Sequence, residues 1–239
     1  MVETEARAAE PSIESWSTIP WRELERRVYR LQKRIYRAQA RGNVRAVHSL
    51  QRLLMKSWSA RALAVRRVTQ DNHGKKTAGV DGVKAVGPLV RLLFVEKLRD
   101  PRAIRARPVR RVLIPKAGKP NEVRPLGIPV MLDRAHQALG KLALEPQWEA
   151  RFEPNSYGFR PGRSCHDALQ AVFTSIGTKA TYALDADIEV CFEHIGHVAL
   201  LAKLDAPHPS DEPSKPGWKR GSCPRAGSRP PRVVARKGT

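Results

Sequence analysis

Cysteine and long apolar runs are scarce in this chain of 239 residues, and each absence excludes a class of protein. The three cysteines, Cys165, Cys191 and Cys223, stand alone in the sequence, so neither a zinc site nor a disulfide framework is indicated. No apolar run approaches the roughly 18 residues that a membrane span requires. The N-terminus, Met-Val-Glu-Thr-Glu, is acidic and unlike a signal peptide. We therefore expect a cytoplasmic protein with no membrane partner.

Acidic residues are also few, because 23 Asp and Glu stand against 44 Lys and Arg, giving a net charge of +21. Such an excess favours a polyanionic partner and says little about the fold. Residues 21–60 carry +9 and residues 61–130 carry +12, whereas residues 131–197 carry −3. Composition alone favours a structural nucleic-acid binder. A basic region beside an acidic, metal-competent centre is also what a nucleic-acid enzyme needs.

The first half of the chain has helical periodicity. We expect residues 1–19 to be disordered, after which apolar residues recur at steps of three and four. These residues are Trp21, Leu24, Val28, Leu31, Ile35 and Ala38. Gly42 and Asn43 end this helix, and a second helical pattern follows over about 44–68. Eleven basic residues against two acidic ones over 21–60 favour contact with RNA or DNA over an ordinary solvated helix surface.

A glycine-rich loop and a hairpin follow these helices. The loop, residues 74–82, carries Lys75 and Lys76, which could bind phosphate, although a plain turn is the simpler interpretation. Residues 107–130 predict a hairpin with its turn at 116–121, because short β-branched runs flank Gly, Pro and Asn. We expect basic side chains at one tip, suited to a triphosphate or a nucleic-acid backbone: Arg110, Arg111, Lys116, Lys119 and Arg124. The alternative is a solvated basic edge that prevents aggregation.

Two further helices are predicted. Asp133 is the expected N-cap of the first, which should end before Pro146. His136 within it is most simply a surface residue or one whose hydrogen bonds are satisfied. Arg160 and Arg163 lie near the start of the second helix, where we expect them to contact a nucleic-acid backbone.

An apolar stretch over 182–192 predicts a buried strand that delivers Asp187 to its end, with Asp185 on the same face. Two-metal phosphoryl transfer needs a second acid nearby, and the sequence offers no obvious one after this strand. From spacing alone, an acidic strand without metal is the more frequent case. Residues 205–239 are rich in proline and glycine without hydrophobic periodicity, so we expect them to be disordered.

Taken together and in order, several motifs resemble the N-terminal half of group II intron-encoded reverse transcriptase/maturases, over roughly residues 15–204. The matching stretches are Leu31-Gln-Lys-Arg-Ile35, Leu63-Ala-Val-Arg-Arg-Val-Thr69, Thr77-Ala-Gly-Val-Asp-Gly82, Arg110-Arg-Val-Leu-Ile-Pro-Lys116, Arg124-Pro-Leu-Gly-Ile-Pro129, Leu142-Ala-Leu-Glu-Pro146, Tyr157-Gly-Phe-Arg-Pro-Gly-Arg-Ser164 and Leu184-Asp-Ala-Asp-Ile188. So many ordered motifs are far more specific than any one of them alone.

The resemblance implies an α+β fold: a helical N-terminal region over 20–98, then the fingers and partial palm of a right-hand polymerase over 99–204. It implies an RNA-directed DNA polymerase of a mobile element that also assists splicing, with Mg²⁺, a DNA primer, dNTPs and group II intron RNA as partners. The implied site residues are Asp187 as catalytic metal ligand, Ile188 as metal ligand through its carbonyl, Lys116 and Arg124 on the triphosphate, and Phe192 beneath the nucleotide sugar.

The sequence also departs from the family. Glu189 stands where the family has lysine and Val190 where it has glycine, which adds bulk near the nucleotide. No Tyr-Ala-Asp-Asp motif is present, and the Arg/Pro-rich tail is typical of a GC-rich gene read out of frame. We therefore expect a truncated or frameshifted, inactive copy of the enzyme. The alternatives are a non-catalytic RNA-binding protein that assists intron RNA and an inert product that folds poorly.

Overall fold

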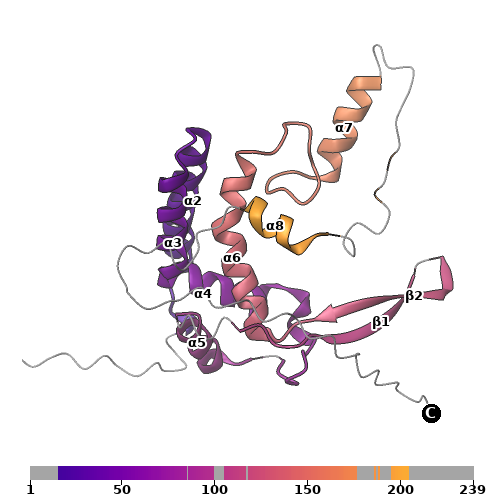
Figure 1. The fold of residues 1–239 in the computed structure, drawn as a ribbon. Helices are drawn as coiled ribbons and strands as arrows, with labels where there is room; N and C mark the ends of the chain where they lie inside the picture. The colour runs from indigo at the N-terminus through magenta and orange to yellow at the C-terminus, as the bar shows by residue number, and fades with distance from the viewer. Residues whose placement is uncertain are drawn as a thin grey trace, which may run out of the picture. The chain divides into compact units, whose positions relative to one another are not determined.

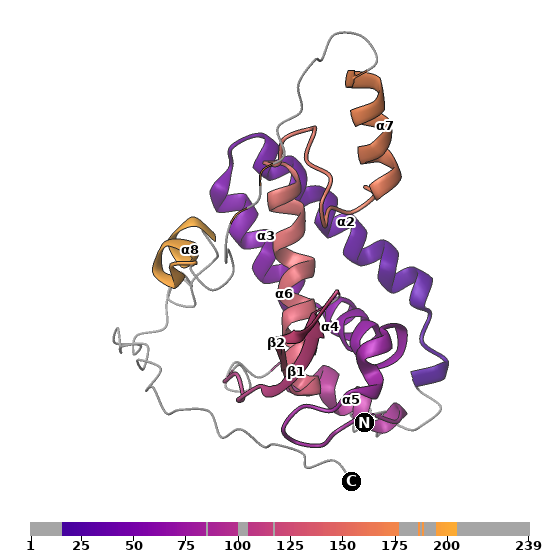
Figure 2. The same cartoon turned by 90° about the vertical axis from the view of Figure 1, so that its right-hand side faces the viewer.

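The structure is a computed structural model that describes residues 16–84, 86–99, 105–116, 118–176, 186, 188 and 195–204 (Figures 1 and 2). Its elements are α2 (Trp21–Ala40), α3 (Val44–Lys56), α4 (Trp58–Arg66), the π-helix η1 (Arg67–Asp71), the 3₁₀ helix η2 (His73–Lys76), α5 (Pro88–Lys97), β1 (Arg110–Lys116), β2 (Lys119–Ile128), α6 (Met131–Glu149), α7 (Cys165–Ile176) and α8 (His197–Leu204). Over the described residues the chain is rich in helix and has one two-stranded sheet, which confirms the predicted α+β class.

The core is built where α6 packs against α2, α3 and α4. Helices α2, α3 and α6 each bury one face, whereas α4 is buried almost all round, and Ile35, Val47, Leu54 and Val65 are completely buried there. Leu139 of α6 is 2% exposed in the same cluster. The helical spacing of apolar residues therefore forms the core that the sequence predicts.

The break between α2 and α3 lies at the predicted position. Gly42 has φ +68°, a left-handed conformation that glycine adopts without steric cost. The Asn43 side chain then accepts a hydrogen bond from Ala46 N at 3.0 Å, which caps α3. The second helix is not continuous to residue 68, because extended backbone at Ser57 separates α3 from α4.

The N-terminal segment is ordered earlier than we expected. Trp16 is 3% exposed, and its Nε1 donates to Gln70 Oε1 at 3.1 Å. Ile19 packs against the same core. The prediction that residues 1–19 are disordered is therefore wrong for the last four of them, because burial of the indole ring favours their order. The rest of that segment lies outside the described residues.

Helix α6 continues through Pro146, contrary to the prediction that it ends before this residue. Proline has no N–H to donate to the carbonyl four residues earlier, that of Leu142. Gln32 of α2 supplies the missing donor, because its Nε2 lies 3.0 Å from Leu142 O. One turn further, Gln51 Nε2 donates to Gln147 Oε1 at 2.6 Å in the completely buried contact between α3 and α6.

Asp133 is not the N-cap that the sequence predicts. Val130 occupies the cap position, and Asp133 lies in the first turn of α6, 8% exposed. Its Oδ2 accepts a hydrogen bond from Arg107 N at 2.8 Å. The carboxylate therefore anchors the incoming chain at the start of the helix, where the helix dipole favours a negative charge.

The hairpin is an antiparallel pair in which Arg110 lies opposite Ile128, and Ile114 opposite Arg124. Its turn is shorter than predicted, because Lys116 already pairs with Lys119.

In the part of the chain that the structure describes, no helix combines the length and the apolar character that crossing a membrane demands.

Candidate nucleic-acid interface

A row of five cations, the basic stripe, runs along the solvent-facing side of α2. Its members recur at steps of four, four, three and four residues: Arg22, Arg26, Arg30, Lys33 and Arg37. This spacing places them opposite the buried Leu24, Val28 and Ile35. At 1.5 Å per residue the stripe is about 22 Å long. All five residues are exposed.

The two acidic residues of α2 do not neutralise the stripe. Glu23 pairs with Arg27 at 3.4 Å, and Glu25 pairs with Arg66 of α4 at 3.2 Å. No stripe residue has an acidic partner among the residues that the structure describes. The stripe is therefore a row of uncompensated positive charge, which attracts a polyanion.

Two tyrosines lie along the edge of the stripe. Tyr29 is 60% exposed and Tyr36 is 45% exposed, and the ammonium group of Lys33 lies 5.6 Å from the centre of the Tyr29 ring. Exposed aromatic rings among cations are typical of surfaces on which nucleic-acid bases stack. The spacing of Tyr29, Lys33 and Tyr36 is visible in the sequence, although neither tyrosine was predicted to be a functional residue.

The predicted phosphate-binding loop is fastened to α6 by Arg134. Its guanidinium donates from Nε to Pro129 O at 2.9 Å, from Nη1 to Gly74 O at 2.8 Å and from Nη2 to Thr77 O at 2.7 Å. Burial lowers the pKa of Arg134, whereas the nearby Asp81 raises it. Sequence reasoning missed this residue, because two of its acceptors lie 57 and 60 positions away along the chain.

The two lysines of this loop differ in their surroundings. Lys75 donates from Nζ to the carbonyl of Gln70, so its ammonium group already has a partner within the fold. Lys76 is exposed at the end of η2. Phosphate binding by the pair stays a prediction, and Lys76 is the freer of the two for that role.

The hairpin does not bring its predicted basic residues to one tip. Arg110 and Arg111 lie at its open end, Arg124 lies in the middle of β2, and Lys116 pairs with Lys119 beside the turn. The prediction was wrong because a strand rises about 3.3 Å per residue, which separates Arg110 from Lys116 by roughly 20 Å. The three arginines are exposed, whereas the side chains of the two lysines lie outside the described part.

Arg160 is a structural residue rather than an exposed phosphate ligand. It is 9% exposed and donates to both carboxylate oxygens of Glu149, at 2.6 and 3.1 Å, and to two backbone carbonyls. The sequence-based expectation of backbone contact therefore does not fit Arg160, because a bidentate ion pair and burial occupy its guanidinium. Arg163 is exposed and stays a candidate.

The start of α7 is capped by a reciprocal pair. Asp167 Oδ2 accepts from Ser164 N and Ser164 Oγ, each at 2.7 Å, and Asp167 N donates back to Ser164 Oγ at 3.3 Å. These hydrogen bonds from Ser164 lower the pKa of Asp167. The carboxylate is thus a helix cap rather than a catalytic group.

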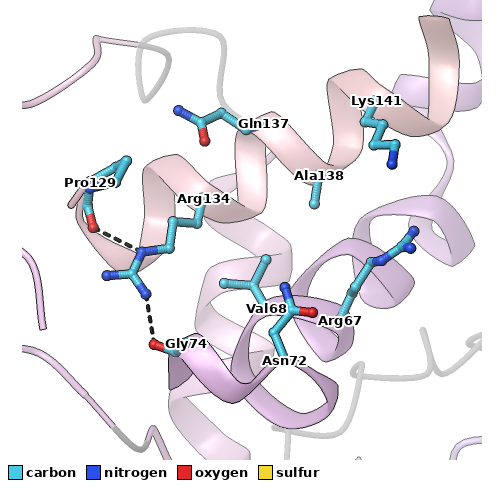
Figure 3. A pocket seen from close by; sticks show the side chains of 9 residues that line it. All are labelled: Arg67, Val68, Asn72, Gly74, Pro129, Arg134, Gln137, Ala138 and Lys141. Atoms are coloured by element: carbon cyan, nitrogen blue, oxygen red, sulfur yellow. Dashed lines mark hydrogen bonds between the residues drawn. The ribbon is translucent and has the colours of Figure 1, made fainter. Parts of the chain in front are cut away.

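A pocket of about 530 Å³ opens between η1 and α6 (Figure 3). Its lining residues are Arg67, Val68, Asn72, Gly74, Pro129, Arg134, Gln137, Ala138 and Lys141. The four lining residues that come from α6 recur at steps of three, one and three residues, which places them on one face of the helix. The π-helix η1 supplies the opposite wall, and such wide turns are frequent at functional sites.

The residues predicted to carry catalysis lie mostly outside the described part of the chain. Asp187 and Phe192 fall there, and so does the Lys116 side chain. Ile188 is described and 72% exposed, and Arg124 is exposed on β2. Within the described residues, no group of three or more His, Cys, Asp or Glu side chains could hold a metal ion. The catalytic assignment therefore stays a prediction.

Comparison with known families decides the identity. The family model of the N-terminal domain of reverse transcriptase matches residues 16–98, and that of the reverse transcriptase (RNA-dependent DNA polymerase) itself matches residues 114–213. The chain belongs to the reverse transcriptase family, and it is similar to group II intron-encoded members of that family. The second match extends beyond Leu204, where we expected the resemblance to end, because that boundary rested on short motifs alone.

Three relatives illustrate the place of this reverse transcriptase chain. It is 37% identical over 164 residues to Protein YkfC of Escherichia coli, covering 64% of this chain and 42% of that protein. It is 41% identical over 98 residues to the group II intron-encoded protein LtrA of Lactococcus lactis, covering 41% of this chain and 16% of LtrA. It is 31% identical over 198 residues to maturase-like protein 1 of Euglena gracilis, covering 78% of this chain and 42% of that protein. The chain thus spans less than half the length of these relatives.

Proposed function

We propose that this reverse transcriptase chain binds the structured RNA of a group II intron, with the basic stripe of α2 as its main contact. The observation that carries the proposal is the stripe itself, five exposed cations without an acidic partner among the described residues. Arg110, Arg111 and Arg124 of the hairpin are further exposed cations. We choose intron RNA as the ligand because a relative of the chain, LtrA, is a group II intron-encoded protein.

Phosphate contacts of this kind are driven by the release of counterions. Each cation that neutralises a phosphate releases bound salt ions, so the affinity falls as salt is added. The stripe, about 22 Å long by its helical rise, is long enough to face several successive phosphates of a nucleic-acid strand. Phosphates of RNA can therefore be contacted by several stripe residues at once.

Replacing one stripe residue tests this function. Arg30→Ala should weaken RNA binding at every salt concentration and reduce the slope of log K against log salt by about 1, because one phosphate contact is lost. The measurement is fluorescence anisotropy of a labelled intron domain titrated with the 239-residue protein at about 50 to 200 mM salt. Lys97→Ala, at the exposed end of α5, is the charge-matched control. Equal losses in the two variants would contradict a role for the stripe.

Polymerisation is a second candidate, supported by the match of residues 114–213 to the reverse transcriptase family model. Asp187 and the Ile188 carbonyl would hold Mg²⁺, because hard oxygen ligands are those that this ion takes. One bound Mg²⁺ would lower the pKa of the primer hydroxyl, and a second would neutralise the leaving pyrophosphate. Lys116 and Arg124 would bind the triphosphate of the dNTP, and Phe192 would exclude a 2′-hydroxyl.

We propose two working regions for this function, a helical RNA-binding region over residues 20–98 and a partial fingers and palm region over residues 99–204. The basic stripe belongs to the first region and the hairpin arginines to the second. The compartment that we propose for this function is the cytoplasm.

A further inference from the structure

We propose that the pocket between η1 and α6 binds one unstacked RNA nucleotide, with the base against Val68 and Ala138 and the phosphate on Arg67. The inference rests on the proposed RNA binding and adds a site that recognises a single bulged or looped-out residue. It concerns a surface other than the basic stripe, because none of the stripe residues lines this pocket.

The size and floor of the pocket suit a nucleobase. Its volume of about 530 Å³ falls in the range of roughly 300 to 1,000 Å³ that small-molecule sites occupy. Val68 is 5% exposed and Ala138 packs against the core, so the floor is apolar and fixed. A planar base loses water-exposed surface when it lies on such a floor, which favours an unstacked base over a paired one.

The polar groups around this floor match the remaining parts of a nucleotide. Asn72 and Gln137 are exposed carboxamides, and neither makes a side-chain hydrogen bond to another described residue. A carboxamide both donates and accepts, as the edge of a base requires. Arg67 is exposed and has no ion pair within the described part, which leaves its guanidinium for a phosphate.

Two other cations of the pocket have different roles. Arg134 is held by three carbonyl acceptors, so it forms a fixed wall rather than a ligand. Lys141 pairs with Glu145 at 3.2 Å, which reduces its attraction for an anion. Arg67 is therefore the anion ligand that the geometry favours, and one free cation beside an apolar floor indicates a nucleotide rather than free phosphate.

The test compares two labelled RNA duplexes of about 20 base pairs, one fully paired and one with a single bulged nucleotide. Fluorescence anisotropy with the full 239-residue chain should show roughly tenfold tighter binding to the bulged duplex, because burial of one base on the apolar floor removes apolar surface from water. The double variant Asn72→Ala/Gln137→Ala should lose this preference and keep its affinity for the paired duplex. Ala138→Leu, which fills the floor with an apolar group, should abolish the preference in the same way.

The outcomes separate this inference from the proposed function. Equal affinity of the wild-type chain for both duplexes would overturn the nucleotide site while leaving RNA binding intact. A preference that survives in both variants, with thermal melts unchanged, would place bulge recognition elsewhere and likewise overturn it. Absence of salt-dependent binding to either duplex would refute RNA binding itself, and the pocket inference with it. If inorganic phosphate at millimolar concentration abolishes the preference for the bulged duplex, the pocket is an anion site without base recognition. That result would overturn the nucleotide site.

Discussion

At the level of single residues, the loop over 74–82 depends on one contact that a larger residue would not permit. A Cβ atom built on Gly79 would lie 2.7 Å from Val130 Cα and 2.9 Å from Pro129 O. Both are backbone atoms, so neither can move aside as a flexible side chain would. The loop and the start of α6 approach this closely only because residue 79 is glycine.

Gly79→Ala should therefore destabilise the protein by about 1 to 3 kcal/mol, the usual cost of overpacking. Gly140→Ala is the matched control, because a Cβ there meets nothing within 4 Å and the residue lies inside α6. Alanine should stabilise that helix by roughly 0.5 to 1 kcal/mol. Urea unfolding followed by circular dichroism measures both. Two variants of equal stability would show that the loop can move away from α6.

The half-buried His136 gives the fold a dependence on pH. Burial lowers the pKa of His136 from its ordinary 6.5, against smaller raising effects of Asp133 and of a backbone hydrogen bond at Leu132. Its Nε2 is buried and has no hydrogen-bond partner among the described residues. The folded state therefore favours the neutral ring, whereas the unfolded chain takes up a proton more readily.

Stability should consequently be full above pH 6.5 and fall as the pH drops from there through the lowered pKa of the folded state. In His136→Leu this part of the pH dependence should vanish. The free energy of unfolding, measured in urea across this range for both proteins, isolates the histidine because all other groups are shared. Parallel pH curves for the two proteins would contradict the assignment.

At the level of elements, α6 is held to α2 by a hydrogen bond that replaces one of its own. Pro146 leaves the Leu142 carbonyl without its helical donor, and Gln32 Nε2 supplies a donor at 3.0 Å. The contact is part-buried, so losing it would leave an acceptor with reduced access to water. A proline that would end an isolated helix is thus accommodated by a neighbouring helix.

A double-mutant cycle tests whether the Gln32 side chain replaces the N–H that Pro146 lacks. Gln32→Leu should cost about 1 kcal/mol in the wild-type background, the usual value for a hydrogen bond. In a Pro146→Ala background the restored N–H can satisfy Leu142, so the same change should cost less. Thermal or urea unfolding of the four proteins gives the coupling energy. Additive effects would mean that Gln32 acts through packing alone.

At the level of the whole molecule, catalysis requires more than binding. The proposed RNA binding draws mainly on the exposed cations of the first region, whereas polymerisation needs Mg²⁺, primer, template and dNTP held together. The chain spans 42% of Protein YkfC and 16% of LtrA, so the activity of the longer relatives is a separate question from RNA binding.

Primer extension on an RNA template answers that question directly. If the chain polymerises, extension should require Mg²⁺ and be abolished in Asp187→Ala, with RNA affinity unchanged. Arg30→Ala should instead reduce extension only at template concentrations below saturation. Extension that persists in Asp187→Ala would exclude this carboxylate as the metal ligand, and absence of extension by a folded, RNA-binding wild-type chain would leave the binding function alone.

Features that depend on near neighbours could be predicted from the sequence. The apolar stripe of α2, the break at Gly42 and Asn43 and the hairpin all follow from local spacing and backbone preference. The family also followed from ordered motifs, and the family models confirm it. Each of these conclusions draws on residues close together in the chain.

The tertiary structure decided which polar side chains have partners inside the protein. Arg160 is occupied by Glu149, and Pro146 is tolerated because Gln32, more than 100 positions away, donates to the carbonyl that it leaves free. Likewise, Arg134 fastens the loop of residues 74–82 through acceptors distant in sequence. The sequence by itself determined the apolar stripe and basic face of α2, the hairpin and the family, whereas the availability of each cation for a ligand depended on long-range contacts that no local pattern records.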